Sequence, residues 1–407
     1  MKPRVLMIAY ACVPNGGGEH WLGWGWAKEA ARNFDVTLVT TPKARPQLEE
    51  AAKPLGITPH FVDVSPVFRK LTEQTGSNWF RKLAWQRKVL RLARQLHEAK
   101  PFSLAHQTTF HSFRVPFLAT QLGIPSVWGP IAGGEHVPPG FEQYLGSAKA
   151  SERNRNMFNR LCLRMPSVRR SLETASTLFV SNHTTLNFLP SSSRKKSIIV
   201  PPNSLRPEDE ARPPRARWPA SESQRLFNLL YVGNCVATRA IPLVFDALLK
   251  SGLTDYEFHI VGDGPALAGW KELARAPGLN ERVRFAGKVP HAELIEYYDD
   301  ADALVFPALR DSGGSALLEA MARYVPVICL DWGGPGEMMD NQSGIKIPVQ
   351  SPKETVELFG AALIRLKNDP ALGRKFALAA RERARSMFHW EAKRELLEST
   401  YRRLIRT

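Results

Sequence analysis

One 35-residue stretch, ALVFPALRDSGGSALLEAMARYVPVICLDWGGPGE (303–337), constrains the fold of this chain more than any other. Its order of buried strand, loop, helix and second buried strand is typical of an α/β fold. The loop at 310–314 has little side-chain bulk, and strong helix formers follow it at 316–323. A glycine-rich turn before a helix leaves unpaired N–H groups at the positive end of the helix dipole, so it predicts a site for an anion, most often a phosphate.

Two carboxylates frame this expected anion site. Asp311 precedes the glycines, and Glu319 lies eight positions further on, about one turn into the helix. A carboxylate is a good hydrogen-bond acceptor for the vicinal hydroxyls of a ribose or a hexose. A phosphate held between two such acids indicates a nucleotide sugar. Taken singly, each acid is better explained as a turn cap or a solvated helix residue.

The stretch resembles the donor-site signature of glycosyltransferase family 4, the retaining GT-B sugar transferases. In that pattern an acid is followed, after seven residues, by a Glu within L-E-A-M-A, here 318–322, and then by a P-V-I strand, here 326–328. Asp311 stands where the family usually has Glu, which shortens the reach to the sugar by one methylene. The D-S-G-G sequence is similar to a branch of the family associated with bacterial surface polysaccharides.

The resemblance implies a role for each candidate residue. Glu319 would hold the ribose hydroxyls, Asp311 a hydroxyl of the donor sugar, and Arg239 the leaving diphosphate. His106 completes the candidates for catalysis. The donor-binding candidates are Gly17, Gly18, Glu19, Gly233, Asn234, Val289, Ser312, Gly313, Gly314 and Ser315. No enzymic nucleophile stands out, which agrees with the leaving-group-assisted attack usually proposed for the family.

The second half departs from the family in one turn. The family has G-R-L followed by K-G there, and its two cations bind the diphosphate. Here Gly233 is kept, Asn234 replaces the arginine and Arg239 replaces the lysine. Losing one charge-assisted phosphate bond costs on the order of 1.5–3 kcal/mol. The replacement of arginine by Asn234 therefore predicts weaker donor binding, and it does not affect the prediction of the fold.

The N-terminal region predicts strand, glycine loop, helix and strand over residues 1–40. The spacing G-x-G-x-x-G is absent and Thr40 and Thr41 stand where an acid would bind ribose, so NAD is disfavoured. In the family this glycine loop faces the donor phosphates. A strand-end histidine lies near the reacting sugar in many relatives. His106 fits that role better than His111, although either can be a structural histidine.

Length and patterning predict two domains. A chain of 407 residues exceeds one typical core, and the proline-rich, charged segment PPNSLRPEDEARPPRARWPA (201–220) divides it almost in half. We expect an α/β fold of GT-B type, with two Rossmann-like α/β/α domains facing across a cleft. The expected parts are an acceptor-side domain at 1–203, a linker at 204–222, a donor domain at 223–385, and a terminal helix at 386–407 that packs back on the first domain.

The charge is unevenly placed. Residues 1–205 hold 27 Lys and Arg against 12 Asp and Glu, which is +15 of the total net charge of +16. This basic half implies an anionic partner, such as phospholipid, nucleic acid or a polyanionic acceptor. A basic amphipathic helix is expected from Asn78, and a core-packed helix with a solvated cationic face explains it slightly better than membrane docking. No recognised nucleic-acid-binding module occurs, which disfavours DNA and RNA.

Compartment and cofactors follow from what the sequence contains. The four cysteines are scattered without a C-x-x-C, and no apolar run approaches the ~20 residues of a spanning helix, so we expect a cytoplasmic protein that is at most peripheral on the inner face of the membrane. The D-x-D at 300–302 is interpreted as a solvated helix terminus. The resemblance implies no metal and no cofactor beyond the nucleotide-sugar co-substrate.

The sequence therefore favours a retaining, metal-independent hexosyltransferase acting on a nucleotide-diphosphate sugar. Its acceptor would be a lipid-linked or saccharide hydroxyl in the synthesis of surface polysaccharide or lipopolysaccharide. Two alternatives stay open. One is a catalytically weakened GT-B protein that binds anionic lipid or nucleic acid, and the other is a nucleotide-sugar epimerase on the same architecture.

Overall fold

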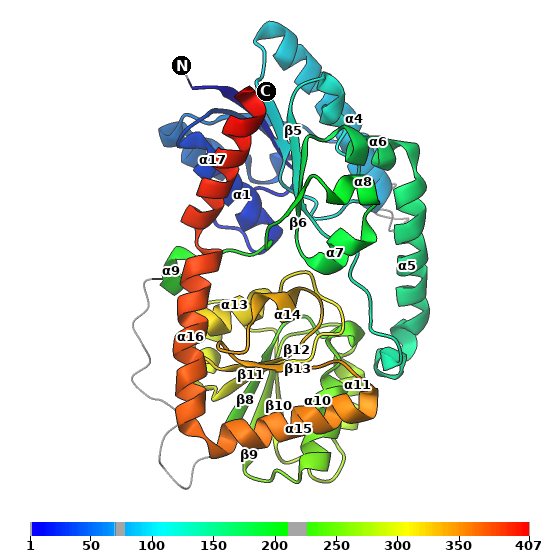
Figure 1. Cartoon of the computed structure of the whole chain (residues 1–407), viewed down its shortest axis with the longest axis vertical. Helices are drawn as coiled ribbons and strands as arrows, with labels where there is room; N and C mark the ends of the chain where they lie inside the picture. Colours follow the sequence, from blue (N-terminus) through cyan, green and yellow to red (C-terminus); the bar gives the residue numbers. More distant parts are fainter. Residues whose placement is uncertain (1, 69, 71–77, 211–225, 407) are drawn as a thin grey trace. The chain divides into compact units, whose positions relative to one another are not determined.

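The computed structural model describes residues 2–68, 70, 78–210 and 226–406, which form two compact units (Figure 1). Unit 1 comprises residues 1–134, 155–202 and 390–407, and unit 2 comprises residues 135–154 and 203–389. Of the expected linker, residues 211–222 lie outside the described part of the chain. Each unit is an α/β sheet with its own core, and each is described by itself.

Unit 1 is built on a seven-stranded sheet in the order β3-β2-β1-β4-β5-β6-β7, in which every neighbouring pair is parallel. Its strands are β1 (Arg4–Ala9), β2 (Asp35–Thr40), β3 (Thr58–Phe61), β4 (Leu104–Gln107), β5 (Ser126–Ile131), β6 (Thr177–Val180) and β7 (Ser197–Ile199). The central strands are buried on both faces, which explains the mostly apolar sequences of β1 and β5, while β4 ends in the buried polar residues His106 and Gln107.

The helices of unit 1 cover this sheet (Figure 1). They are α1 (Glu19–Ala31), α2 (Arg45–Ala52), α4 (Asn78–Ala99), the C-terminal part of α5 (Lys149–Arg164), α6 (Pro166–Thr174), α7 (His183–Phe188), α8 (Ser191–Arg194) and α17 (Trp390–Arg406). On α4 the apolar side packs on the core, with Val89 and Ala93 fully buried, and Arg87, Lys88 and Arg91 are exposed. Helix α4 thus packs its apolar side on the core and leaves a cationic side in solvent, as the core-packed interpretation expects.

The final helix, α17, is an integral part of unit 1. The indole of Trp390 fills a notch at Gly25 on α1, where a Cβ would lie 1.9 Å from the ring. Further along α17, the ring of Tyr401 packs edge-on against Phe34. The glycine in the middle of α1 is therefore required by the close approach of a neighbouring ring.

Unit 2 is built on a six-stranded parallel sheet in the order β10-β9-β8-β11-β12-β13. Its strands are β8 (Phe227–Val232), β9 (Tyr256–Val261), β10 (Val283–Gly287), β11 (Ala303–Phe306), β12 (Val327–Leu330) and β13 (Ile345–Ile347). Its helices are α9 (Pro207–Glu210), α10 (Ile241–Ser251), α11 (Leu267–Leu273), α12 (Leu294–Asp300), α13 (Ser315–Ala322), α14 (Gly333–Met338), α15 (Pro352–Asn368) and α16 (Pro370–Phe388). The order changes direction between β8 and β11, where parallel α/β sheets commonly bind their ligands.

Residues 135–154 belong to unit 2, although the sequence had suggested an unbroken first domain to residue 203. The reason is packing: Phe141 is fully buried in the core of unit 2. Tyr144 donates a hydrogen bond to Asp246 Oδ2 at 3.1 Å, and the Trp332 indole donates to the His136 carbonyl at 2.8 Å. Helix α5 consequently begins in one unit and ends in the other.

No helix among the described residues is long and apolar enough to cross a membrane.

Candidate active site

The loop between β11 and α13 has the structure that the sequence predicts. Helix α13 begins at Ser315, and Gly314 precedes it with φ 66°, a left-handed conformation that favours glycine. No side chain caps this helix start in the described part of unit 2. The first N–H groups of α13 are thus left at the positive end of the helix dipole, which suits an anionic ligand.

Asp311 and Arg239, assigned to different parts of the donor by resemblance, form an ion pair with each other. Arg239 ends the short 3₁₀ helix η5 (Ala237–Arg239), and its guanidinium lies over the Phe306 ring, 5.1 Å from the centroid. The second carboxylate oxygen of Asp311 accepts the Gly313 N–H at 3.1 Å. The carboxylate therefore links the guanidinium to the glycine loop.

Burial by itself would raise the pKa of Asp311, but the Arg239 guanidinium and the Gly313 N–H outweigh burial and the pKa is lowered. For Arg239, burial opposes the charge while Asp311 favours it, and the pKa is raised. Both side chains are ionised at neutral pH. The Nε of Arg239 is buried and has no hydrogen-bond partner in the described structure, so one donor of the guanidinium remains open.

Glu319 lies on α13, and its carboxylate Oε2 accepts a hydrogen bond from the Tyr298 hydroxyl at 2.9 Å. Burial raises the pKa of Glu319, and the Tyr298 hydrogen bond together with His291 opposes this increase. The interpretation of Glu319 as a solvated helix residue is therefore not supported. Tyr298 lies on α12, and no pattern in the sequence pointed to it.

The turns after β8 and β9 are in close contact. Gly233 has φ 150°, and a Cβ on Gly262 would lie 1.9 Å from the Gly233 carbonyl oxygen. Asn234 is exposed, and its backbone carbonyl accepts the Tyr231 hydroxyl at 3.0 Å. Val289, which follows β10, is partly buried against the core. These residues all come from unit 2, at the carboxyl ends of its strands, as does the 311–315 loop.

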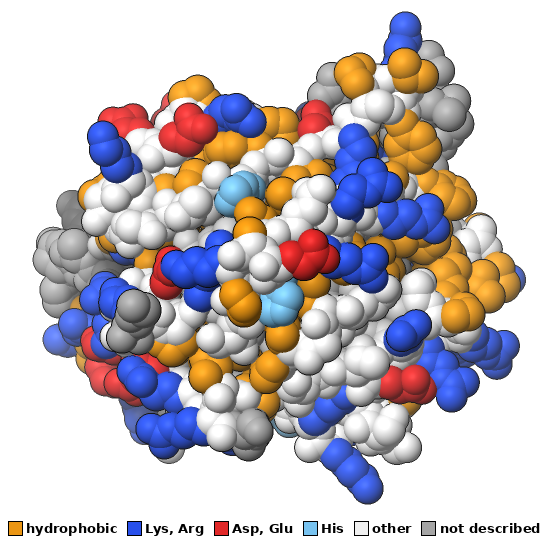
Figure 2. All heavy atoms as spheres, turned by 90° about the horizontal axis from the view of Figure 1, so that it is seen from above, with side chains coloured by type: hydrophobic (Ala, Val, Ile, Leu, Met, Phe, Trp, Pro, Cys, Tyr) orange, Lys and Arg blue, Asp and Glu red, His pale blue; other side chains and the backbone are white. Residues whose placement is uncertain are grey.

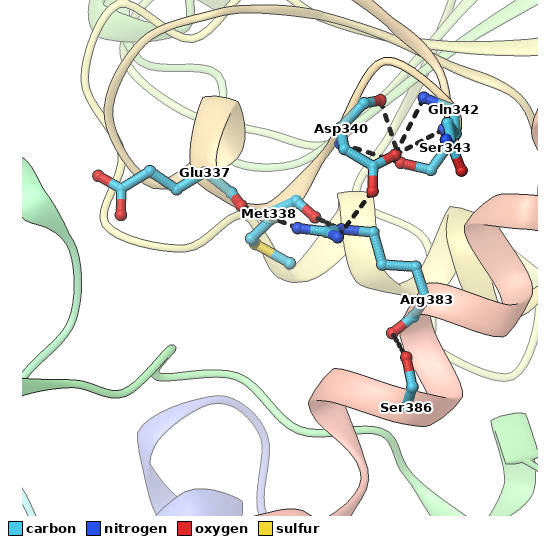
Figure 3. A network of polar contacts seen from close by, with 7 residues as sticks. All are labelled: Glu337, Met338, Asp340, Gln342, Ser343, Arg383 and Ser386. Atoms are coloured by element: carbon cyan, nitrogen blue, oxygen red, sulfur yellow. Dashed lines mark hydrogen bonds and ion pairs between the residues drawn. The ribbon is translucent and has the colours of Figure 1, made fainter.

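A second glycine turn supports the 311–315 loop. A Cβ on Gly334, in α14, would lie 2.2 Å from the Ser312 carbonyl oxygen, and the Gly334 N–H donates to the Asp311 carbonyl at 3.1 Å. Arg383 of α16 holds the other end of α14: it donates to the Met338 carbonyl at 2.6 Å and pairs with Asp340 at 2.8 Å (Figure 3).

In unit 1 the glycine loop leads into α1, which begins at Glu19. Gly17 and Gly18 face open space, with no atom within 4 Å of a Cβ on either. Glu19 Oε1 accepts the Phe110 N–H at 2.7 Å. Phe110 and the next residue, His111, both have positive φ, 84° and 28°. Because residues other than glycine rarely adopt a positive φ, two such residues in succession indicate a strained backbone in this loop.

The two candidate histidines differ in burial and in hydrogen-bond partners. His106 is fully buried, with one ring nitrogen 2.5 Å from the Tyr401 hydroxyl and the other 2.8 Å from the Gly129 carbonyl. Burial lowers its pKa to about 4. His111 is half-buried, and its Nε2 has no partner in the described part of the chain. Burial lowers the pKa of His111, while Glu19 acts against that decrease. Of the two, only His111 has a ring nitrogen without a partner in the described residues, and that nitrogen is buried.

The D-x-D sequence is structural. Asp302 is buried and its Oδ2 accepts the Asn228 N–H at 2.8 Å, so the interpretation as a solvated helix terminus holds for Asp300 alone. Within residues 2–68, 70, 78–210 and 226–406, no group of three or more His, Cys, Asp or Glu side chains could hold a metal ion.

The chain is similar to known proteins in part of its sequence and in its fold. Residues 215–385, which make up less than half of the chain, match the family described as glycosyl transferases group 1. Glycogen synthase of Mycobacterium tuberculosis is 32% identical over 182 residues, which is 43% of this chain and 43% of that protein. The alignment thus spans less than half of the curated relative.

Solved structures resemble the chain over nearly its whole length. Sucrose-phosphate synthase of Thermosynechococcus elongatus has a TM-score of 0.66 at 20% identity, covering 99% of both chains. HepE of Anabaena in complex with UDP has a TM-score of 0.65 at 14% identity, covering 99% of this chain and 100% of that one. At these identities the likeness shows the fold: two Rossmann-like α/β units of the GT-B type.

Proposed function

We propose that the protein is a glycosyltransferase that moves a sugar from a nucleotide-diphosphate donor to a hydroxyl acceptor. One observation carries the proposal: the uncapped start of α13 lies between Glu319 and the ion pair of Asp311 with Arg239. Anion-binding N–H groups, a cation and a hydroxyl-accepting carboxylate are the groups that a nucleoside diphosphate requires. The similarity to group 1 glycosyl transferases, and UDP in the Anabaena structure, support the same donor class.

In this proposal unit 2 binds the donor. Glu319 accepts hydrogen bonds from the ribose, and the N–H groups of Gly314 and Ser315 bind the diphosphate, while the Gly313 N–H stays on Asp311. Arg239 supplies a positive charge that stabilises the leaving group as the glycosidic bond breaks. Asp311 is already engaged by Arg239 and Gly313, so its role becomes that of orienting the guanidinium and the loop. Asn234, Ser312, Gly233 and Val289 complete the donor-binding set.

Unit 1 would supply the acceptor side. Gly17 and Gly18 leave room for a ligand, and Glu19 fixes the strained loop at 110–111. The unpartnered Nε2 of His111 is buried, so it would bind a hydroxyl only if this loop moved. His106 is left out because both of its nitrogens are used inside the unit. Retention of anomeric configuration, metal independence and a role in bacterial surface polysaccharide or lipopolysaccharide synthesis belong to the proposal through the family resemblance.

We also propose that the protein works at the inner face of a cell membrane, on a lipid-linked or saccharide acceptor. A face of unit 1, termed here the α4–α5 face, consists of Phe80, Met157, Leu161, Arg160 and Arg164. Its three apolar side chains are 56%, 66% and 53% exposed. The two helices meet through Trp79 and Phe158, whose ring centroids are 6.2 Å apart.

Single exposed apolar residues are ordinary, but a group of them among arginines fits a membrane surface. Exposed Arg87, Lys88 and Arg91 on α4 add positive charge. Figure 2 shows Lys and Arg side chains spread over one face of the molecule, with hydrophobic side chains between them. Charge complementarity therefore favours an anionic phospholipid surface as the partner.

Vesicle sedimentation tests this docking. The protein should bind phosphatidylcholine vesicles that contain phosphatidylglycerol and not pure phosphatidylcholine. Since each arginine near an anionic surface contributes about 1 kcal/mol, Arg160→Gln with Arg164→Gln should weaken binding about 30-fold. Met157→Ser with Leu161→Ser should also weaken it. Leu249→Ser with Leu358→Ser, at exposed sites of unit 2, is the matched control. Equal binding by all variants would remove the α4–α5 face from the proposal.

A thermal-shift panel of UDP, GDP, ADP and dTDP and their sugar conjugates, with and without EDTA, tests the donor site. A ligand at 100 times its Kd adds about 2.7 kcal/mol of stability. We expect one nucleotide to respond, unaffected by EDTA. Silence across the panel, with stabilisation by anionic lipid or RNA, would instead favour a binding protein without turnover, for which Asn234 is the supporting observation. Exchange at C2 of the donor sugar without transfer would indicate an epimerase.

A further inference from the structure

We propose that Tyr298 is a positioning residue for donor binding: its hydroxyl fixes one oxygen of the Glu319 carboxylate and so leaves the other oxygen to accept hydrogen bonds from a ribose. This inference rests on the proposed nucleotide-sugar site. It goes further by assigning a role to Tyr298, which lies on a different helix, α12, and 21 positions before Glu319 in the sequence.

The geometry around Glu319 carries the argument. Tyr298 is 1% exposed, and its hydroxyl lies 2.9 Å from Glu319 Oε2 and 3.2 Å from the Ala316 carbonyl. Among the described residues of unit 2, the Glu319 side chain forms its hydrogen bond with this hydroxyl. A carboxylate offers about four acceptor positions, so most of them remain open. One fixed oxygen restricts the flexible side chain, which lowers the entropic cost of binding two vicinal hydroxyls.

Tyr298 is itself held by a buried ionic cluster. The Arg323 guanidinium lies 5.9 Å from the centre of the Tyr298 ring, and it pairs with Asp209 of α9 at 2.6 Å. Arg381 of α16 donates to the carbonyls of Asp209 and Ala322, at 2.8 and 2.7 Å. Three helices, α9, α13 and α16, are thereby tied together beside the ring. A tyrosine supported in this way is a rigid donor for Glu319.

The electrostatics agree with this role. Around Glu319 the charged and titratable groups are Tyr298 from α12, His291 before α12, Asp209 from α9 and Arg206 before α9. Burial raises the pKa of the carboxyl, and the Tyr298 hydroxyl counteracts burial by stabilising the ionised form. Without the hydroxyl the carboxyl stays protonated to a higher pH. A protonated carboxyl accepts fewer hydrogen bonds from a ribose.

The test is the affinity for the nucleoside diphosphate, among UDP, GDP, ADP and dTDP, that stabilises the wild type, measured by calorimetry from pH 5 to pH 8. In Tyr298→Phe we expect binding about tenfold weaker at the acidic end of this range, from the loss of one charge-assisted hydrogen bond. The loss should shrink as pH rises, because the midpoint of the pH profile moves upward. The turnover number at saturating donor should change less than KM.

Two further variants separate positioning from damage to the fold. Tyr256→Phe removes a hydroxyl that donates to the Gly278 carbonyl at 3.1 Å in the same unit, and its pH profile should match the wild type. Glu319→Gln, a neutral isostere, should bind weakly at every pH. A Tyr298→Phe profile with an unchanged midpoint, or a loss of affinity equal at every pH, would overturn the inference alone. Absence of binding by the wild type would overturn the proposed donor site and the inference together.

Discussion

The ion pair between Asp311 and Arg239 allows one prediction to be worked through in detail. The two side chains are only 12% and 19% exposed, so each charge depends on the other for compensation. In Asp311→Asn the amide oxygen can still accept the Gly313 N–H, but the Arg239 charge is left buried without its partner. Breaking a buried pair in this way costs about 3–5 kcal/mol, and the partial exposure here places the estimate at about 3 kcal/mol.

Calorimetric unfolding measures this cost. In a unit of about 200 residues, a loss of about 3 kcal/mol lowers Tm by about 6–12 °C. Asp255→Asn is the control, because Asp255 pairs with Lys367 in the same unit but is 69% exposed, and its loss should cost less than about 1 kcal/mol. The double variant Asp311→Asn with Arg239→Met should recover most of the lost stability, since no charge is left buried.

The pH dependence of the same variant gives a second check. Because the pKa of Asp311 is lowered in the folded protein, its contribution is complete above the unfolded pKa of about 3.9 and is lost as pH falls through the folded value. The stability difference between wild type and Asp311→Asn should therefore narrow in acid. A Tm change below 2 °C at neutral pH, or a double variant no more stable than Asp311→Asn, would refute the reasoning.

Three more variants probe other parts of the structure. Lys393 is buried, and burial lowers its pKa to about 7, so the folded protein disfavours the charged form. The protein should therefore gain stability as pH rises from 7 toward the unfolded pKa, by about 5 kcal/mol at most. Lys393→Met should remove this pH dependence of the unfolding free energy in calorimetric curves, and an unchanged pH dependence would contradict the prediction. Gly334→Ala should lower the free energy of unfolding by about 2 kcal/mol or more and weaken nucleotide binding, because the added Cβ would meet the Ser312 carbonyl. Gly269→Ala on α11 is the control: its Cβ would have free space, so the change should be neutral or stabilising in the same thermal melts. His111→Ala should lower sugar transfer with little change in Tm, while His106→Ala should lower Tm; the reverse pattern would restore His106 to the site.

Much of the fold could be predicted because its signals are local. The stretch at 303–337 gave β11, the glycine loop, α13 and β12 to within about two residues, since buried parallel strands and helix formers are distinct over short windows. The glycine loop followed by α1 in unit 1 was equally clear. The assignment of residues 135–154 to unit 2 was not predicted, because nothing in their composition indicates that Phe141 packs in the core of unit 2.

The site was predicted less completely, for a physical reason. The family resemblance makes Asp311, Glu319 and Arg239 candidates, but it does not say that Asp311 pairs with Arg239 across 72 residues. The partner of Glu319 is Tyr298, which is remote in the sequence and carries no motif. His106 fitted the strand-end pattern, yet its hydrogen bond to Tyr401 comes from the far end of the chain. Side-chain partners brought together by folding are invisible to local patterns.

Transferase activity would be tested by the release of nucleoside diphosphate from the donor sugar that the thermal panel identifies, with the sugar passing to water or to an added hydroxyl acceptor, for the wild type and for Glu319→Ala. Both proteins are compared at equal concentration, with their Tm values measured in parallel. The account predicts steady release by the wild type and a decrease in kcat/KM of more than about tenfold in the variant, with similar Tm. Equal rates for the two proteins, or no release by a wild type that binds the donor, would contradict it.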